Sequence, residues 1–393
     1  MSDVGSGLEF AASLVLPEDL ARPPSGTAGS GSAGSPQHRW LAAVSAGATA
    51  PELLRHVARR TAVRGRRAGP SLTVPVRPAS LRSGSRAALR RWLFSGVVVL
   101  PAEGGFPAPE SPLHRVVAEA GLTLPEATFW SGSGGSLVAP ALLGSTPVVL
   151  RVFPETAEKR HTHAQRTLRH LETHAVRRVP RPMGSGEAHG LLWLVESRLP
   201  GRRPRRQSPR LRSQVLDFCV DLPADGLPAV APAERIPDVL DPGILVRLRR
   251  LGHAAATVWS GEAPVGTHGD LWEGNVLESG SGLSGVVDWD AYRSDEVPGT
   301  DLVHLVATAE RLRHHRSMGA ELLTRPWSRE PLRALASAYF RRLGLGMNED
   351  RWSAVGVAWW LGQLTDTLQR TPELARDEAW LQRNVLAVLT AYE

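Results

Sequence analysis

The segment 268–290 constrains this chain more than any other part of its sequence. It reads HGDLWEGN at its start and VVDWD at its end. Asp270 can accept or orient the proton of an attacking hydroxyl, while Asn275 and Asp288 offer the oxygen ligands that Mg²⁺ prefers. Charge held at such positions suits phosphoryl transfer, whose transition state is stabilised mainly by electrostatics. A tight turn in which the Asp caps a helix and the Asn closes a loop is the alternative explanation.

Protein kinases have the same interval between a catalytic Asp and a metal-binding Asn, followed by a second metal-binding Asp on the next strand. The His-Gly-Asp form, with Asp-Trp-Asp after it, resembles the aminoglycoside phosphotransferase and choline kinase family. The resemblance is specific at these positions and extends more weakly over about residues 121–393. It implies that Asp270 is the catalytic base, that Asn275 and Asp288 bind Mg²⁺, and that ATP is the other cofactor.

The resemblance also implies an α+β fold of the two-lobe protein-kinase type, with a small strand-rich N-lobe and a mainly helical C-lobe. We expect a disordered, low-complexity start over residues 1–36 and an N-terminal extension of unknown role over 37–120. The N-lobe and hinge are expected over 121–200, and the helical C-lobe with the catalytic loop over 201–393.

The composition is ordinary for a soluble globular protein, with 42% hydrophobic and 22% charged residues. The net charge of +7 arises mostly from arginine, because Lys159 is the only lysine. This pattern is typical of a GC-rich genome, so the basicity is weak support for a nucleic-acid partner, and none is expected.

The single cysteine, Cys219, excludes an intramolecular disulfide and favours a reducing compartment. The first basic residue is Arg22, so the start lacks the charged region of a secretory signal. The apolar run 93–100 is too short to span a bilayer. We therefore expect a cytoplasmic protein without a transmembrane segment.

The first 120 residues contain no catalytic motif. Residues 23–35 read PPSGTAGSGSAGS, which is typical of a flexible linker. The extension that follows is expected to pack on the next lobe. Because arginines at 82, 86, 90 and 91 precede the apolar run 93–100, docking to a protein partner or a membrane surface is the alternative.

A glycine-rich turn precedes a strong strand in the expected N-lobe. The strand is predicted at Thr146–Phe153 from its β-branched and aliphatic residues, and a helix at Glu155–His174 after it. Glycines allow backbone N–H groups to approach phosphate, so the turn suits a nucleotide-covering loop. A plain hairpin or linker is the alternative. The candidate nucleotide contacts in this turn are Ser133, Gly134, Gly135 and Ser136.

The run 191–201 predicts a buried strand that leads into a turn, and it resembles the family's interlobe hinge. The resemblance places backbone groups near Glu196 and Arg198 against adenine. Arg151 stands where the family has a phosphate-binding Lys, and the usual Glu partner on the following helix is not evident. Either Arg151 contacts phosphate in place of Lys, or the ATP lobe has lost or changed its use.

The rest of the chain is predicted to be mainly helical. Residues 202–241 form a proline-rich insertion, partly irregular, which is either a solvated loop or a substrate clamp. His268 is expected to support its loop by hydrogen bonding, and Asp301 to cap the helix that follows it. The predicted helices are 244–258, 302–314, 331–343, 352–369 and 372–392.

Three functions remain open from the sequence. The first is ATP- and Mg²⁺-dependent phosphorylation of a hydroxyl group on a small molecule. The alternative is a catalytically inactive kinase-like binding or accessory protein in a biosynthetic pathway, which is motivated by Arg151 and the unfamiliar extension. A nucleic-acid binder rests on the arginines alone. The resemblance covers antibiotics, choline-like alcohols, sugars and amino alcohols, so it does not name the acceptor.

Overall fold

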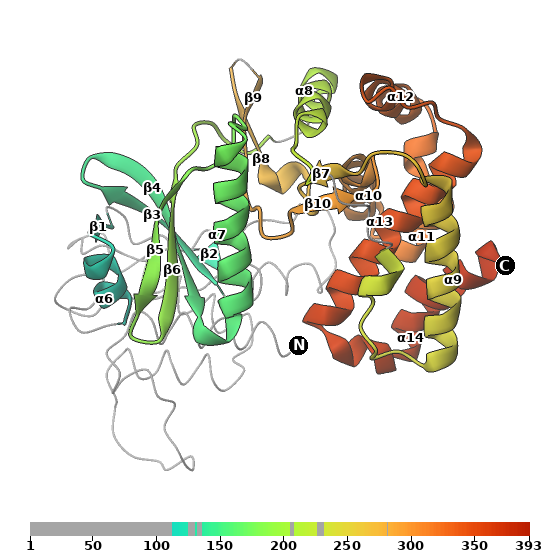
Figure 1. Cartoon of the computed structure of the whole chain (residues 1–393), viewed down its shortest axis with the longest axis horizontal. Coiled ribbons are helices and arrows are strands. Elements are labelled where there is room, and N and C mark those ends of the chain that lie inside the picture. The colour runs from blue at the N-terminus through green and yellow to red at the C-terminus, as the bar shows by residue number, and fades with distance from the viewer. Residues whose placement is uncertain (1–111, 125–129, 132–135, 205–207, 226–231, 281) are drawn as a thin grey trace, which may run out of the picture. The chain divides into compact units, whose positions relative to one another are not determined.

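The structure is a computed structural model of the whole chain, and it describes residues 112–124, 130–131, 136–204, 208–225, 232–280 and 282–393. The described residues form two compact units (Figure 1). One contains the residues up to 165 and segment 181–198, and the other contains segment 166–180 and residues 199–393. The expectations for residues 1–111, including the predicted linker and docking segment, lie outside the described residues.

The first unit is built on an antiparallel sheet in the order β1-β3-β4-β6-β5, with β2 paired to β3. Strand β4 covers the predicted strand and extends it by one residue. Its Val148, Leu150 and Val152 alternate along the strand and are fully buried, as one face of a half-buried sheet requires. The elements are α6 (Pro112–Glu119), β1 (Leu122–Thr123), β2 (Trp130–Ser131), β3 (Leu137–Leu143), β4 (Thr146–Pro154), β5 (Pro182–Ala188) and β6 (Leu191–Ser197).

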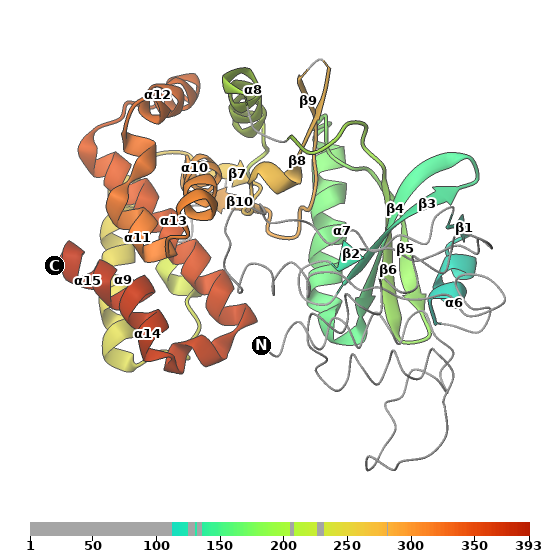
Figure 2. The same cartoon turned by 180° about the vertical axis from the view of Figure 1, so that it is seen from behind.

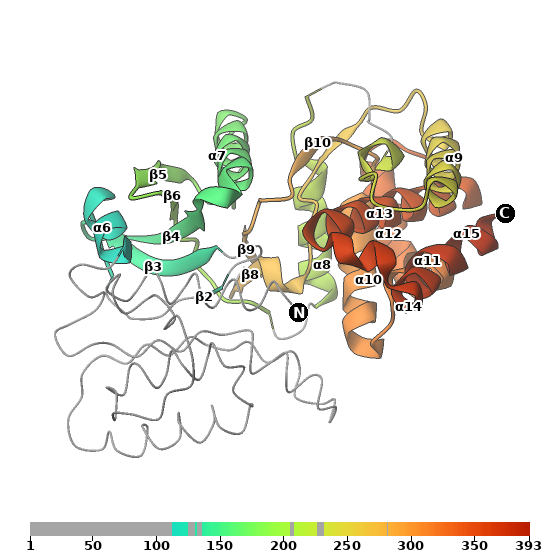
Figure 3. The same ribbon diagram turned by 90° about the horizontal axis from the view of Figure 1, so that it is seen from below.

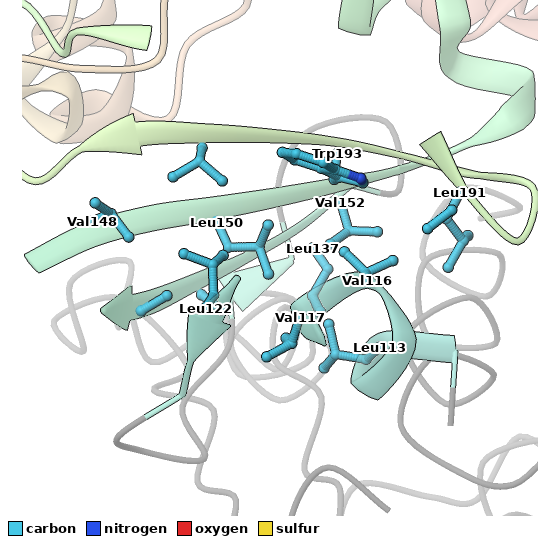
Figure 4. Close-up of a cluster of buried hydrophobic side chains, with 14 residues drawn as sticks. Leu113, Val116, Val117, Leu122, Leu137, Val148, Leu150, Val152, Leu191 and Trp193 are labelled. Carbon is cyan, nitrogen blue, oxygen red and sulfur yellow. The ribbon is translucent and has the colours of Figure 1, made fainter. Parts of the chain in front are cut away.

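Helix α6 closes the hydrophobic core of this unit. Its Leu113, Val116 and Val117 are buried in one cluster with strand residues such as Leu150 and Val152 (Figure 4). Burial of each such side chain contributes roughly 1.5–3 kcal/mol. This helix falls within the segment predicted as an extension, so the end of that segment takes part in the core of the sheet unit.

Helix α7 (Glu158–Thr173) follows a short 3-10 turn at Glu155–Ala157, where the sequence predicts one helix over Glu155–His174. Its first half is hydrogen-bonded to the sheet, since the ring Nε2 of His161 lies 3.0 Å from the carbonyl oxygen of Trp193. Leu168 and Leu171 are buried, as predicted.

The second unit is mainly helical, and the predicted change from a strand-rich first part to a helical second part is confirmed. Helix α9 packs against α13, and α10 packs against α13 as well (Figures 2 and 3). The helices are α8 (Pro209–Val220), α9 (Pro242–Val258), α10 (Thr300–His314), α11 (Met318–Thr324), α12 (Leu332–Arg342), α13 (Glu349–Arg370), α14 (Glu378–Leu381) and α15 (Ala387–Tyr392).

Helix α8 is the main difference from the sequence prediction, which treated the insertion 202–241 as partly irregular. The hydroxyl of Ser208 caps the helix by accepting the N–H of Leu211, and proline occupies the first turn. Leu211, Val215 and Phe218 recur at helical spacing and are buried. The periodic signal is present in the sequence, but the surrounding arginines and prolines obscure it.

Two short β-ribbons lie between these helices along the chain. Strand β7 (Val265–Thr267) pairs with β10 (Arg293–Glu296), and β8 (Val276–Ser279) pairs with β9 (Gly282–Val286). The 268–290 segment therefore begins directly after one strand and contains a complete hairpin. Within the described part of the chain, none of the helices combines the length and apolar character needed to cross a membrane.

Candidate functional site

The loop after β7 turns at Gly269, where the backbone has a φ of +78°. A side chain at this position would place its Cβ 2.1 Å from the carbonyl oxygen of Ala291. Both the left-handed conformation and the close approach of the neighbouring backbone require glycine here. The geometry of the loop therefore explains why the middle residue of His-Gly-Asp is a glycine.

Asp301 fixes the backbone of this loop. One carboxylate oxygen accepts the N–H of His268 at 2.6 Å, and the other accepts the N–H of Gly269 at 2.9 Å. The predicted capping role of Asp301 is wrong, because Gly299 is the N-cap residue of α10 and makes no side-chain cap bond. Burial raises the pKa of Asp301, although the two N–H donors favour its ionised form.

His268 supports the loop through both ring nitrogens, as expected from the sequence. Its Nε2 lies 3.0 Å from the carbonyl oxygen of Val287, and its Nδ1 accepts the N–H of Asp270 at 3.3 Å. Since a carbonyl oxygen only accepts, the ring proton belongs on Nε2. The fully buried ring also packs on Trp289 with 4.6 Å between centroids, so Trp289 acts in packing.

Asp270 and Asn275 are joined by hydrogen bonds, and Asp288 follows shortly after the β8–β9 hairpin. The amide nitrogen of Asn275 donates to the Asp270 carbonyl oxygen at 2.9 Å and to its carboxylate Oδ2 at 3.3 Å. The carbonyl oxygen of Asn275 accepts the N–H of Val287 at 2.9 Å. Val287 is the residue directly before Asp288. Asp288 lies two residues after the end of β9 and has a φ of +71°, so the backbone turns sharply there.

The residues of this loop fit a magnesium ion. Because the amide nitrogen of Asn275 is directed at Asp270, its amide oxygen is the atom that can coordinate a cation. Together with the Asp288 carboxylate it gives two hard oxygen ligands, which suits Mg²⁺ because that ion completes its shell with phosphate and water. Among the described residues no group of three or more His, Cys, Asp or Glu side chains could hold a metal by itself.

His304 contacts the candidate base and was not predicted from the sequence. Its Nε2 lies 3.2 Å from Asp270 Oδ1, and the imidazole is buried. Burial raises the pKa of Asp270, but the hydrogen bond and the electrostatic influence of His304, with smaller contributions from His268 and Arg370, outweigh it and lower the pKa below its usual value. The spacing of positions 301 and 304 on one helical face is the only sequence signal for this contact.

In the first unit, Arg151 has the acidic partner that the sequence did not reveal. Its Nη1 lies 3.2 Å from Oε1 of Glu196, and both side chains are buried. The partner is on strand β6 and not on the following helix, where the sequence shows no evident Glu. The guanidinium also lies over the Phe153 ring, with 5.1 Å to its centroid.

The remaining candidate nucleotide contacts are described only in part. Ser136 is buried directly before β3, whereas Ser133, Gly134 and Gly135 lie outside the described residues. At the predicted hinge, the N–H of Arg198 donates to the carbonyl oxygen of Pro147 at 3.3 Å. This N–H group is therefore engaged within the sheet unit.

The chain is similar to several proteins of known structure. An aminoglycoside phosphotransferase, APH(3'')-Id from Streptomyces rimosus, is 18% identical with a TM-score of 0.46, over 64% of this chain and 97% of that one. The same enzyme has a structure in complex with ADP and streptomycin, which is 16% identical with a TM-score of 0.45 over the same shares. A thermostable mutant of the aminoglycoside phosphotransferase APH(4)-Ia, in a ternary complex with ADP and hygromycin B, is 17% identical with a TM-score of 0.43. The match with this mutant covers 70% of this chain and 97% of the mutant's chain.

A comparison with curated proteins found no match. The Phosphotransferase enzyme family matches residues 140–354, which is more than half of the 393 residues. The matched region includes the His-Gly-Asp loop, the β8–β9 hairpin, the whole of α10 and the start of α13. On this match, the chain belongs to the phosphotransferase enzyme family.

Proposed function

We propose that this phosphotransferase moves the γ-phosphoryl group of ATP, with Mg²⁺, to a hydroxyl group of a small molecule. The observation that carries the proposal is the connected set of Asp270, Asn275 and Asp288. Asn275 is bonded to Asp270 through its side chain and to Val287 through its main chain. These contacts support a site in which Asp270 takes a proton and the oxygen atoms of Asn275 and Asp288 hold the metal, within one loop and hairpin of a family member.

In this reaction the acceptor oxygen forms a bond to the γ-phosphorus, while the bond from that phosphorus to the β–γ bridging oxygen breaks and ADP leaves. Asp270 orients the hydroxyl and takes its proton. Its side chain is 40% exposed, so an acceptor can reach it. Asn275 and Asp288 would hold Mg²⁺, whose charge stabilises the phosphates.

Residues 121–200 serve in this proposal as the nucleotide lobe, and residues 201–393 as the catalytic lobe. Arg151 is assigned to phosphate, and the backbone near Glu196 and Arg198 to adenine. A planar guanidinium has five N–H donors, so it can bond Glu196 and a phosphate oxygen together. The assigned covering turn consists of Ser133, Gly134, Gly135 and Ser136.

A second candidate function is a kinase-like binding or accessory protein without transfer activity. The observation in its favour is the buried ion pair between Arg151 and Glu196, because Arg151 stands at the position where the family has a phosphate-binding Lys. A guanidinium committed to this pair would leave the nucleotide without its usual ammonium contact.

Calorimetric titration of the full chain with a non-hydrolysable ATP analogue, with and without Mg²⁺, tests the proposal. The Asp288→Ala variant should lose the Mg²⁺-dependent part of the binding. Asp377→Ala is the matched control, because Asp377 is an exposed carboxylate that only caps α14 through the N–H of Trp380. The control should bind as the wild type does.

Phosphoryl transfer is then measured as ADP release in a screen of amino alcohols, sugars and aminoglycosides. Asp270→Asn should lower the turnover about 10²-fold or more, because positioned general bases contribute roughly 10²–10⁴-fold. A turnover equal to the wild type in Asp270→Asn would remove Asp270 as the base. Nucleotide binding that no acceptor class converts into ADP release would favour the accessory protein.

A further inference from the structure

One face of helix α10 is directed at the candidate catalytic loop. Positions 301, 304 and 308 share this face, since they are three and four residues apart. Asp301 bonds the loop backbone, while the Nε2 of His304 lies 3.2 Å from the carboxylate of Asp270 and 3.3 Å from the hydroxyl of Thr308. The backbone and the side chain of the loop are thus fixed by different residues of one helix.

Trp359 on α13 determines which nitrogen of His304 carries the proton. Its indole Nε1–H donates to His304 Nδ1 at 3.1 Å, and both side chains are buried. An indole nitrogen only donates, so Nδ1 must offer a lone pair and the imidazole proton must be on Nε2. That proton faces Oδ1 of Asp270, and a carboxylate is a stronger acceptor than the nearby hydroxyl.

The carboxylate of Asp270 is consequently held from two sides. His304 donates to Oδ1, and the amide of Asn275 donates to Oδ2. With one donor on each oxygen, rotation of the carboxylate about its terminal bond would break both hydrogen bonds. The lone pairs that these two donors do not use belong to a side chain that is 40% exposed, so they are left for an acceptor hydroxyl.

We propose that His304 is a positioning residue of the phosphoryl transfer, which holds Asp270 in the orientation that receives the acceptor proton and is itself kept neutral by Trp359. The proposal rests on the proposed function. His304 does not relay the proton in this arrangement, because Nε2 is already protonated. A proton placed on Nδ1 would face the indole N–H of Trp359 at hydrogen-bond distance.

The hydrogen-bond arrangement can be tested without any activity measurement. In full-length protein labelled with ¹⁵N-histidine, a ¹⁵N–¹H spectrum that detects two-bond couplings identifies the tautomer of each ring. The signals of His304 are assigned by their loss in His304→Gln. We expect a neutral ring with its proton on Nε2, and a shift of that proton signal in Asp270→Asn. A proton on Nδ1, or a signal indifferent to Asp270→Asn, would overturn the proposal.

The positioning role is tested by phosphate release from Mg²⁺·ATP with water as the acceptor. His304→Leu removes the donor at similar volume, and kcat should fall roughly 10- to 100-fold, a part of what a general base supplies, with KM for ATP within twofold. His304→Gln should restore most of kcat. The amide of Gln has an oxygen acceptor and an N–H donor bonded to the same carbon, as the neutral imidazole has Nδ1 and Nε2–H bonded to the same carbon. Leu and Gln variants with the same kcat would contradict the role.

Two adjacent tryptophans provide a matched pair of controls. Trp359→Phe removes the donor to His304, and Trp360→Phe removes an equally buried indole N–H that donates to the carbonyl oxygen of Asn384 at 2.9 Å. Both should lower the melting temperature similarly. Only Trp359→Phe should change the His304 tautomer and lower kcat, and an equal kcat in the two variants would count against the proposal.

Binding of the ATP analogue in the same samples separates the two ways of failing. A wild type that binds no nucleotide and releases no phosphate refutes the proposed function, and the positioning role with it, even if the tautomer of His304 is as expected. If the wild type binds and turns over ATP, and His304→Leu does both equally well, the positioning role alone is refuted.

Discussion

The same substitution, Asp to Asn, should have opposite results at two positions of the second unit. Asp301 and Asp241 each accept two backbone N–H groups. At Asp241, the N-cap of α9, one oxygen accepts both, from Gly243 at 2.8 Å and from Ile244 at 3.3 Å. At Asp301 the two bonds go to different oxygens. An amide has one oxygen, so Asn can keep both bonds at position 241 but only one at position 301.

The difference in burial adds to the difference in geometry. Asp241 is exposed, where Asn and Asp are nearly equal caps, so the loss is the interaction with the helix dipole, about 0.3–1 kcal/mol. Asp301 is 3% exposed. Loss of one charge-assisted bond costs roughly 1.5–3 kcal/mol, and a buried N–H that faces the new NH₂ group adds about 1–3 kcal/mol. Burial of the Asp301 carboxylate raises its pKa, because the charged form is poorly solvated there. The neutral Asn side chain avoids this penalty, which offsets part of the cost.

We therefore expect Asp301→Asn to lower the free energy of unfolding by about 2–4 kcal/mol and Asp241→Asn by less than about 1 kcal/mol. Urea unfolding followed by far-ultraviolet circular dichroism measures both free energies. The variants can be compared with the wild type when their m-values equal that of the wild type. Equal losses in the two variants would refute the assignment of the two N–H donors to separate oxygens of Asp301.

Two further predictions concern the same loop. Gly269→Ala should prevent correct folding of the loop, because its Cβ would lie 2.1 Å from the Ala291 carbonyl oxygen, whereas Gly261→Ala has open space and only backbone strain of about 1–3 kcal/mol. Comparable melting temperatures for the two variants would contradict this. The lowered pKa of Asp270 means that its stabilising contribution is complete above the unfolded value of about 3.9 and is lost as the pH falls through the folded value. In urea midpoints measured from pH 6 to pH 3, the advantage of wild type over Asp270→Asn should shrink below about pH 4, and a constant difference would exclude the shift.

Contacts between residues near in sequence were predictable here. Asp270 and Asn275 are separated by one short turn, and Asp288 follows a hairpin whose register places Val286 opposite Val276. Local pattern is enough to predict that these side chains share a loop. The strand β4 and most helices were predictable for the same reason, since periodic burial is a local signal.

Contacts that depend on packing of distant segments were not predictable. His304 is 34 positions from Asp270, and Trp359 is 55 positions from His304. Sequence spacing alone does not identify either contact, because the helices α10 and α13 must pack before these side chains meet. Asp301 was recognised as structural, but its partners were not, since the carboxylate is directed back at the loop instead of at the N-terminus of its own helix.

The ion pair of Arg151 and Glu196 follows from the register of the sheet. Arg151 on β4 lies opposite Leu194, and Val149 lies opposite Glu196, so the two charged residues are diagonal neighbours on one face of adjacent strands. Protein kinases draw the acidic partner of their phosphate-binding Lys from a helix, whose position controls whether the pair forms. Here both partners are on strands, and the pair forms whenever the sheet forms. The Arg151–Glu196 pair therefore depends on the register of two strands, whereas the kinase pair depends on the position of a helix.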